Sequence, residues 1–144
     1  ACLAGKTLAT AESITAGGIG AALTAVPGAS AVYKGGIISY CDEAKHYLLG
    51  VPAELLNTHG AVSAPVAEAM AQGARKALRT DIAISVTGLA GPGGDDFGHS
   101  VGTVFIGYAD GNTAFAREYH FSGDRDFVRS QTIEAALRLI LENV

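Results

Sequence analysis

Two polar side chains in the first third of the sequence are suited to acyl chemistry. Ser13 follows the strand-like segment Lys6–Ala11 and precedes a run of small residues. A hydroxyl at such a junction lies near the free backbone N–H groups that open a helix, where an oxyanion or a phosphate is stabilised. Ser13 is therefore the first candidate nucleophile, with the alternative that Ser13 or Thr15 is only the N-cap of the helix.

Lys45 is the candidate general base. It lies in a segment with several apolar neighbours, and burial lowers the pKa of a lysine from about 10.4 and favours the neutral amine that a base requires. The alternative is an exposed helix lysine. No Asp or Glu is evidently placed to orient any of the four histidines, which argues against a Ser-His-Asp triad.

A glycine-rich segment and two arginines form a third group of candidates. Thr87–Gly94 (TGLAGPGG) allows close approach of the backbone to a ligand, but lacks the spacing of a dinucleotide fingerprint. Arg125 and Arg129, one helical turn apart, could grip a phosphate or could be surface residues paired with nearby acids. Asp95, Asp96 and His99 could suggest a metal site, but short acids at glycine turns are usually turn formers, so no metal is predicted.

The elements that must position these residues follow from hydrophobic periodicity and turn signals. We expect strands at 6–11, 32–40, 81–87, 101–108 and 113–121, and helices at 16–26, 42–49, 52–60, 63–78 and 124–141. The last helix should bury Phe127, Ile133, Ala136, Leu137 and Ile140. This order predicts an α/β fold with a mixed sheet covered by helices.

Ligand sites on such sheets gather at the carboxyl ends of strands. Three junctions meet that description: Ser13 after the first strand, 40–45 after the second and 87–94 after the third. The sequence therefore predicts that these junctions converge on one site.

Composition limits the class of protein. The chain has 144 residues, 49% of them hydrophobic and 17% charged, with a formal net charge of −4. These values predict one domain without general affinity for nucleic acid. No apolar run is long enough to span a membrane and no charged-then-apolar leader opens the chain, so we expect the domain to be soluble and cytoplasmic. Cys2 and Cys41 are expected to be reduced, packed thiols. The opening residues, Cys2-Leu3-Ala4-Gly5, look like the end of a helix cut short.

Several short segments, in order along nearly the whole chain, together resemble one family. They are TAES at 10–13, VPGAS at 26–30, Tyr40 with EAK at 43–45, LGVP at 49–52, GAVS at 60–63, TGLAGPGG at 87–94 and VGT at 101–103. The chain resembles the C-terminal domain of the competence/damage-inducible protein CinA, which also occurs alone as nicotinamide-nucleotide amidase. It departs from the usual family pattern at Ile14, Ala16 and His99-Ser100.

The resemblance implies an α/β/α sandwich that hydrolyses the carboxamide of nicotinamide mononucleotide, without metal or cofactor. It makes Ser13 the nucleophile and Lys45 the general base, supported by Tyr40. The positions matching other residues that the family needs for activity are Gly28 and Thr87. The remaining predicted substrate-binding residues are Thr15, Gly88, Ala90, Gly91, Arg125 and Arg129.

Two other functions stay open at this stage. One is a non-catalytic domain that binds a nucleotide or a protein partner, and the other is an amidase for a different small amide, since fold alone does not specify the substrate. A small domain this rich in apolar residues is also expected to form a homo-oligomer.

Overall fold

The computed structural model describes residues 5–144 and contains one five-stranded sheet with the order β2-β1-β3-β4-β5. Strand β1 (Leu8–Glu12) pairs in parallel with both β2 (Tyr33–Ile38) and β3 (Ile82–Gly88). Strands β4 (Thr103–Ala109) and β5 (Ala114–His120) continue the sheet in antiparallel orientation. The predicted mixed sheet is confirmed.

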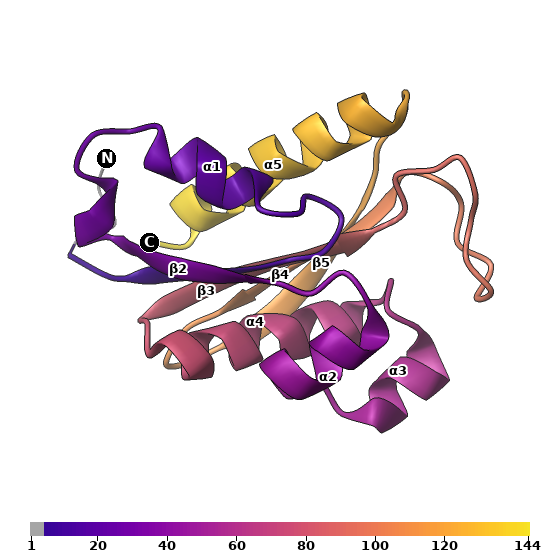
Figure 1. Ribbon diagram of the computed structural model, residues 1–144, viewed down its shortest axis with the longest axis horizontal. Coiled ribbons are helices and arrows are strands. Elements are labelled where there is room, and N and C mark those ends of the chain that lie inside the picture. The colour runs from indigo at the N-terminus through magenta and orange to yellow at the C-terminus, as the bar shows by residue number, and fades with distance from the viewer. Residues whose placement is uncertain (1–4) are drawn as a thin grey trace.

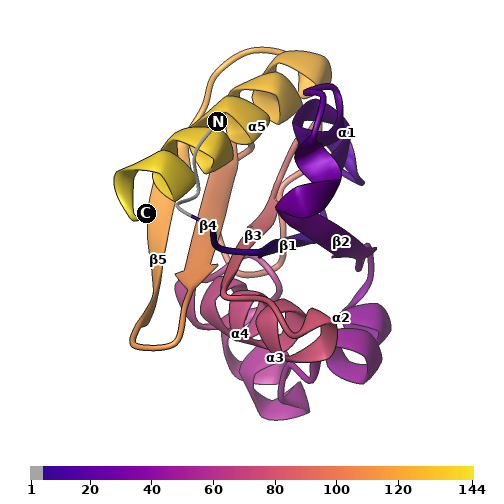
Figure 2. The same cartoon turned by 90° about the vertical axis from the view of Figure 1, so that its left-hand side faces the viewer.

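Helices cover both faces of the sheet (Figures 1 and 2). On one face lie α1 (Gly18–Thr24) and α5 (Arg125–Glu142). On the other lie α2 (Asp42–Leu49), α3 (Ala53–His59) and α4 (Ala64–Leu78). A short 3₁₀ helix, Ala29–Ala31, precedes β2. The expected α/β/α sandwich is therefore the observed fold.

Each face of the sheet has its own hydrophobic core. Residues of β1 and β3 alternate between the two cores, because successive side chains of a strand point to opposite faces. Leu8, Ile82 and Ile84 belong to the core beneath α1 and α5, while Ala9, Ala11 and Ala83 belong to the core beneath α4. The three inner strands β1, β3 and β4 are almost wholly buried, and this explains their nearly continuous apolar sequences.

Helices α2 and α4 approach each other closely at one point. A Cβ atom on Gly73 of α4 would overlap the carbonyl oxygen of Leu49, the last residue of α2. Only glycine leaves room for this backbone contact. The contact matters because α2 carries Lys45.

Four details differ from the sequence predictions or cannot be compared with them. Helix α1 begins at Gly18 instead of residue 16, because Ala16 and Gly17 have left-handed φ values of 48° and 96°. Phe127, predicted to be buried, is 55% exposed because it lies in the first turn of α5 against Gly123, while Ala136 and Ile140 are buried as expected. Cys41 is exposed rather than packed. The expected helix end at Cys2–Ala4 lies outside the described residues.

Within residues 5–144, no helix has both the length and the apolar character needed to cross a membrane.

Candidate active site

Ser13 and Lys45 lie side by side at the carboxyl edge of the parallel strands. Ser13 directly follows β1, and Lys45 projects from α2, which begins shortly after β2. The Lys45 Nζ atom is 3.1 Å from Ser13 Oγ. Both residues are buried: Lys45 is 2% exposed and Ser13 is 8% exposed. The structure thus brings together the predicted nucleophile and base at hydrogen-bond distance.

Lys45 is held by neutral partners. Its Nζ atom also donates a hydrogen bond to the Ser39 carbonyl oxygen at 2.9 Å, and within residues 5–144 no carboxylate forms an ion pair with it. Burial lowers the pKa of Lys45 from its ordinary value, against smaller opposing effects of Asp42 and Cys41. The environment therefore favours the neutral amine more than water does.

The pair opens into a cleft of about 270 Å³. The three strand-end junctions, which were predicted to converge, meet here. The lining residues come from the end of β1, the start of α2, the segment before α4, the end of β3 with its following loop, and the start of α5: Ser13, Ile14, Tyr40, Asp42, Lys45, Ala61, Val62, Thr87, Gly88, Leu89, Ala90, Gly91, Gly93 and Arg125.

Arg125 connects two sides of the cleft. Its guanidinium donates to the Tyr40 hydroxyl and to the Gly91 carbonyl oxygen, each at 2.8 Å. Tyr40 is 60% exposed, whereas Ser13 and Lys45 are buried, so Tyr40 lies at the mouth of the cleft. The arginine therefore places a positive charge at the entrance.

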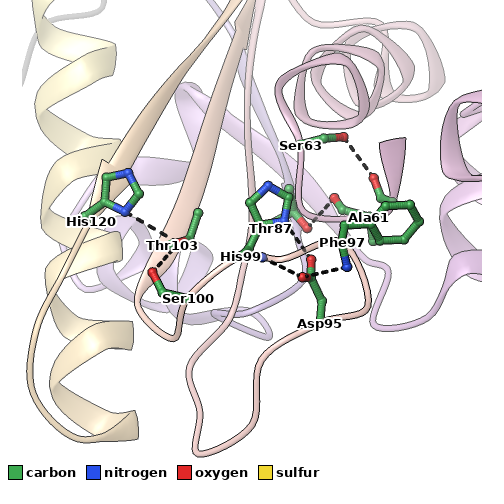
Figure 3. A network of polar contacts seen from close by, with 10 residues as sticks. Ala61, Ser63, Thr87, Asp95, Phe97, His99, Ser100, Thr103 and His120 are labelled. Atoms are coloured by element: carbon green, nitrogen blue, oxygen red, sulfur yellow. Dashed lines mark hydrogen bonds and ion pairs between the residues drawn. The ribbon is translucent and has the colours of Figure 1, made fainter. Parts of the chain in front are cut away.

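The glycine-rich loop is organised by its own polar groups (Figure 3). At its base, the Thr87 hydroxyl donates to the Ala61 carbonyl oxygen at 2.9 Å, which ties β3 to the segment before α4. Farther along, Asp95 accepts hydrogen bonds from the backbone N–H groups of Phe97 and His99 and contacts His99 Nδ1 at 2.7 Å. Asp95 is thus a turn former, as expected for a short acid in such a loop.

The start of α1 is occupied by a buried carboxylate that sequence reasoning missed. Glu12, only 1% exposed, accepts hydrogen bonds from the N–H groups of Gly17, Ile19 and Gly20. We expected Ser13 to lie beside free N–H groups at a helix start. That expectation is wrong for these three N–H groups, because Glu12 already binds them. The available signal was an acidic residue at the end of an apolar strand, shortly before the expected helix start.

Three of the predicted substrate-binding residues do not line the cleft. Gly28 precedes β2 and borders an apolar cavity beneath α1 and α5. Because β1 and β2 are parallel, it lies at the opposite edge of the sheet from Ser13. The Thr15 hydroxyl donates to Glu12 at 2.6 Å, and Arg129 donates to the carbonyl oxygens of Ile14 and Thr15 at 3.1 and 3.3 Å. Thr15 and Arg129 thus bind the turn that carries Ser13.

Two histidines have carboxylate partners that the sequence did not reveal. His99 contacts Asp95, and His120 contacts Glu118, each at 2.7 Å. None of the four histidines lines the Ser13 cleft, so residues 5–144 contain no Ser13-His-carboxylate arrangement. In the described part of the chain, no three His, Cys, Asp or Glu residues are grouped as a metal site would require.

Comparison with known proteins gives a consistent result. Residues 2–144 match the model of the CinA C-terminal domain. A CinA-like protein of Parasynechococcus marenigrum is 52% identical over 135 residues, which cover 92% of this chain and 32% of that protein. A CinA-like protein of Geobacter metallireducens is 50% identical over 133 residues, with the same two coverages. The chain thus spans about a third of the length of these relatives.

Solved structures show the same fold. A competence-damaged protein (CinA) superfamily protein from Escherichia coli aligns with a TM-score of 0.95 and 33% identity, covering 97% of this chain and 81% of the other. The competence damage-inducible protein A from Klebsiella pneumoniae aligns with a TM-score of 0.94 and 37% identity, covering 96% and 86%. With the match over residues 2–144, these similarities show that the chain belongs to the CinA C-terminal domain family.

Proposed function

We propose that this domain is an amidohydrolase that converts nicotinamide mononucleotide and water to nicotinate mononucleotide and ammonia. The observation that carries the proposal is the 3.1 Å contact between Lys45 Nζ and Ser13 Oγ, made by two buried side chains inside a polar cleft. The choice of substrate follows from the family resemblance. The chemistry follows from the two residues themselves.

In the proposed reaction, the neutral amine of Lys45 removes the Ser13 proton as Oγ attacks the carboxamide carbon. Lys45 then gives this proton to the departing ammonia, and an ester of Ser13 remains. Water attacks the ester with Lys45 again as base, so that the carboxylate leaves and Ser13 is restored. One water is consumed and one ammonia is released, and no metal or cofactor takes part in these steps.

Backbone N–H groups of the cleft are suited to hold the oxyanion. Within residues 5–144, no hydrogen-bond acceptor is found for the N–H groups of Ile14, Ala90 and Gly91, all of which belong to cleft-lining residues. Such donors stabilise a developing oxyanion because they are fixed before the reaction begins. They replace the α1 donors, which are bonded to Glu12.

Arg125 is the proposed anchor for the 5′-phosphate. It lines the cleft near the mouth, and its two observed partners, a phenol and a carbonyl, are neutral. A phosphate dianion forms stronger, charge-assisted hydrogen bonds with a guanidinium than either partner does. Arg129 does not share this role, because its guanidinium is bonded to the turn after Ser13.

The test is ammonia release from nicotinamide mononucleotide by the purified domain, with Ser13→Ala beside it. We expect release by the wild type and a loss of about 10³-fold or more in the variant. Serine-independent release would contradict the mechanism. A folded wild type that binds the mononucleotide without turnover would support a binding domain, and turnover of other amides alone would assign a different substrate.

A further inference from the structure

The turn that carries Ser13 has an unusual backbone. Ser13 donates its N–H to the Val86 carbonyl oxygen, and its own carbonyl accepts the N–H of Ala16, both at 3.2 Å. The chain then passes through two consecutive left-handed residues, Ala16 and Gly17. A non-glycine residue in this region is strained and persists only where surrounding contacts hold it. The contacts that hold this turn therefore also fix the nucleophile.

Glu12 holds the turn from the inside. Its carboxylate accepts N–H groups from Gly17 at 3.2 Å, Ile19 at 2.9 Å and Gly20 at 3.0 Å. It also accepts the hydroxyls of Thr15 at 2.6 Å and Thr10 at 3.1 Å. In the described part of the chain no cation forms an ion pair with Glu12, so its charge is balanced by these five donors and by the positive end of α1.

Arg129 holds the same turn from α5. Its guanidinium donates to the carbonyl oxygens of Ile14 and Thr15. Glu12 thus binds N–H groups that follow the left-handed residues, while Arg129 binds carbonyls that precede them. Opposite charges fix both sides of one turn without contacting each other as an ion pair.

We infer that Glu12, assisted by Arg129, is a positioning residue that fixes Ser13 Oγ against Lys45; this rests on the proposed function. Successive residues at the end of β1 project to opposite faces. Glu12 accordingly contacts α1 on one face while Ser13 contacts α2 on the other. Glu12 does not line the cleft, so it acts through the backbone and not on the substrate.

Glu12→Gln is the informative variant. The amide keeps the size of the side chain but replaces one acceptor oxygen with a donor, and a donor cannot bind the N–H groups of Ile19 or Gly20. A displacement of a reacting group by about 1 Å can reduce a rate by about 100-fold. We expect kcat for nicotinamide mononucleotide to fall by about this factor, with KM changed by less than about threefold.

If Glu12 had only a structural role, Glu12→Gln would lower the stability of the protein without lowering kcat at a nearly constant KM. Ile140→Val, a change in the buried core beneath α5, is the matched control: it should lower stability and leave kcat unchanged. The pH profile of Glu12→Gln should keep the wild-type position, because Glu12 is not among the groups that shift the pKa of Lys45. All assays are made where circular dichroism shows each variant to be folded.

A second measurement separates this inference from the amidase proposal. The rate at which a fluorophosphonate labels Ser13 reports the nucleophile without any amide substrate. Slow labelling in Glu12→Gln, with rapid labelling in the wild type, supports the inference even if nicotinamide mononucleotide proves not to be the substrate. Wild-type rates of labelling and turnover in folded Glu12→Gln would overturn it.

If Glu12→Gln does not fold, Thr15→Val takes its place. Valine has nearly the shape of threonine and removes only the 2.6 Å hydrogen bond to the carboxylate. We expect a smaller fall in labelling rate and kcat, about three- to tenfold, with unchanged KM. Labelling and turnover at wild-type rates in this variant would contradict the inference.

Discussion

At neutral pH a lysine in water is protonated, but Lys45 is buried and its hydrogen-bond partners are neutral. The nearby Asp42 offsets only part of the cost of burying its charge. Because burial lowers its pKa, a larger fraction of Lys45 is neutral at any pH below 10.5 than of an exposed lysine. The hydroxyl of Ser13 therefore has beside it an amine that is suited to act as a base, without a histidine. Two consequences can be measured, one for rate and one for stability.

The first concerns the rate. If neutral Lys45 is the base, kcat/KM rises with pH and levels off above the pKa of Lys45 in the free protein, which lies below 10.5. Lys45→Ala should lower kcat by about 10²- to 10⁴-fold and abolish the rise of kcat/KM with pH. The measurement is a pH profile of ammonia release by both proteins. A profile that falls as pH rises through this range would contradict the assignment.

The second concerns stability. Below the folded-state pKa, Lys45 is protonated in both states, and its buried charge costs folding free energy. Between that pKa and 10.5 the unfolded chain binds a proton that the folded chain lacks, so stability rises with pH in this window. Lys45→Met removes the charge, and we expect it to be more stable than the wild type at pH 7, with a difference that shrinks as pH increases.

Urea unfolding of both proteins at several pH values tests this expectation. Other groups also titrate at alkaline pH, so the quantity to follow is the difference between the two proteins. Lys76→Met on α4, where the lysine is exposed, is the control and should change stability by less than about 0.5 kcal/mol. Equal stabilities of Lys45→Met and wild type at pH 7 would show that burial of the ammonium is not costly.

Arg125 gives a prediction about substrate recognition. Replacing it with Gln removes charge-assisted hydrogen bonds worth about 1.5–3 kcal/mol, so KM for nicotinamide mononucleotide should rise by about 10- to 100-fold. The KM for nicotinamide riboside, which has no phosphate, should stay the same. Arg138→Gln, an exposed position of α5 paired with Glu134, is the control. An equal change for both substrates would exclude the phosphate as the partner of Arg125.

Residue types predicted the pair formed by Ser13 and Lys45 but not the contacts that support it. Ser13 and Lys45 stood out because a hydroxyl and a partly buried amine follow strand ends. Glu12 and Arg129 bind backbone atoms of the left-handed turn, and Thr15 binds the Glu12 carboxylate. No sequence pattern had indicated that turn. Their roles could be recognised only after the turn itself was known.

At the scale of elements, the position of Lys45 depends on how α2 lies against α4. The backbone contact between Gly73 and Leu49 fixes the end of the helix that carries the lysine. Alanine is the better helix former by about 1 kcal/mol. Its methyl group would nevertheless overlap a carbonyl oxygen, and overpacking of this kind costs about 1–3 kcal/mol. The overlap should therefore outweigh the gain in helix propensity.

We expect Gly73→Ala to unfold at a lower temperature and to lose about tenfold in kcat, since α2 must move away from α4 and take Lys45 with it. Thermal unfolding and steady-state kinetics measure the two effects. Gly111→Ala is the matched control, because a methyl group there meets only the tip of the Arg75 side chain at 3.4 Å. Full activity of Gly73→Ala would show that α2 adjusts without displacing the lysine.

Element order was predictable, while element ends were less so. Periodicity located each of the five strands and five helices in the correct sequence. It also placed Phe127 on the buried face of α5, where the structure shows it exposed. Periodicity describes the middle of a helix that lies over the sheet, and it fails in the first turn of α5, where Phe127 lies over Gly123 instead.

At the scale of the whole molecule, the site depends on segments that are far apart in the chain. Ser13, Lys45, Thr87 and Arg125 come from four separate regions, and the sheet brings them to one cleft. The rule that ligands bind at the carboxyl ends of strands predicted this convergence for three of these regions. It did not predict the position of Gly28, which the family resemblance had grouped with the site. Because β1 and β2 are parallel, Gly28 lies at the opposite edge of the sheet.

The pairing of β1 with β3 also has a consequence for folding kinetics. Residues 8–12 bind residues 82–86, so this parallel contact closes a loop of more than seventy residues, and contacts of such long range form slowly. Ser13 comes into place only with this contact, since its N–H binds Val86. On refolding from urea, helical circular dichroism should recover before Ser13 regains fluorophosphonate reactivity. Simultaneous recovery of both signals would mean that the central pairing forms together with the helices.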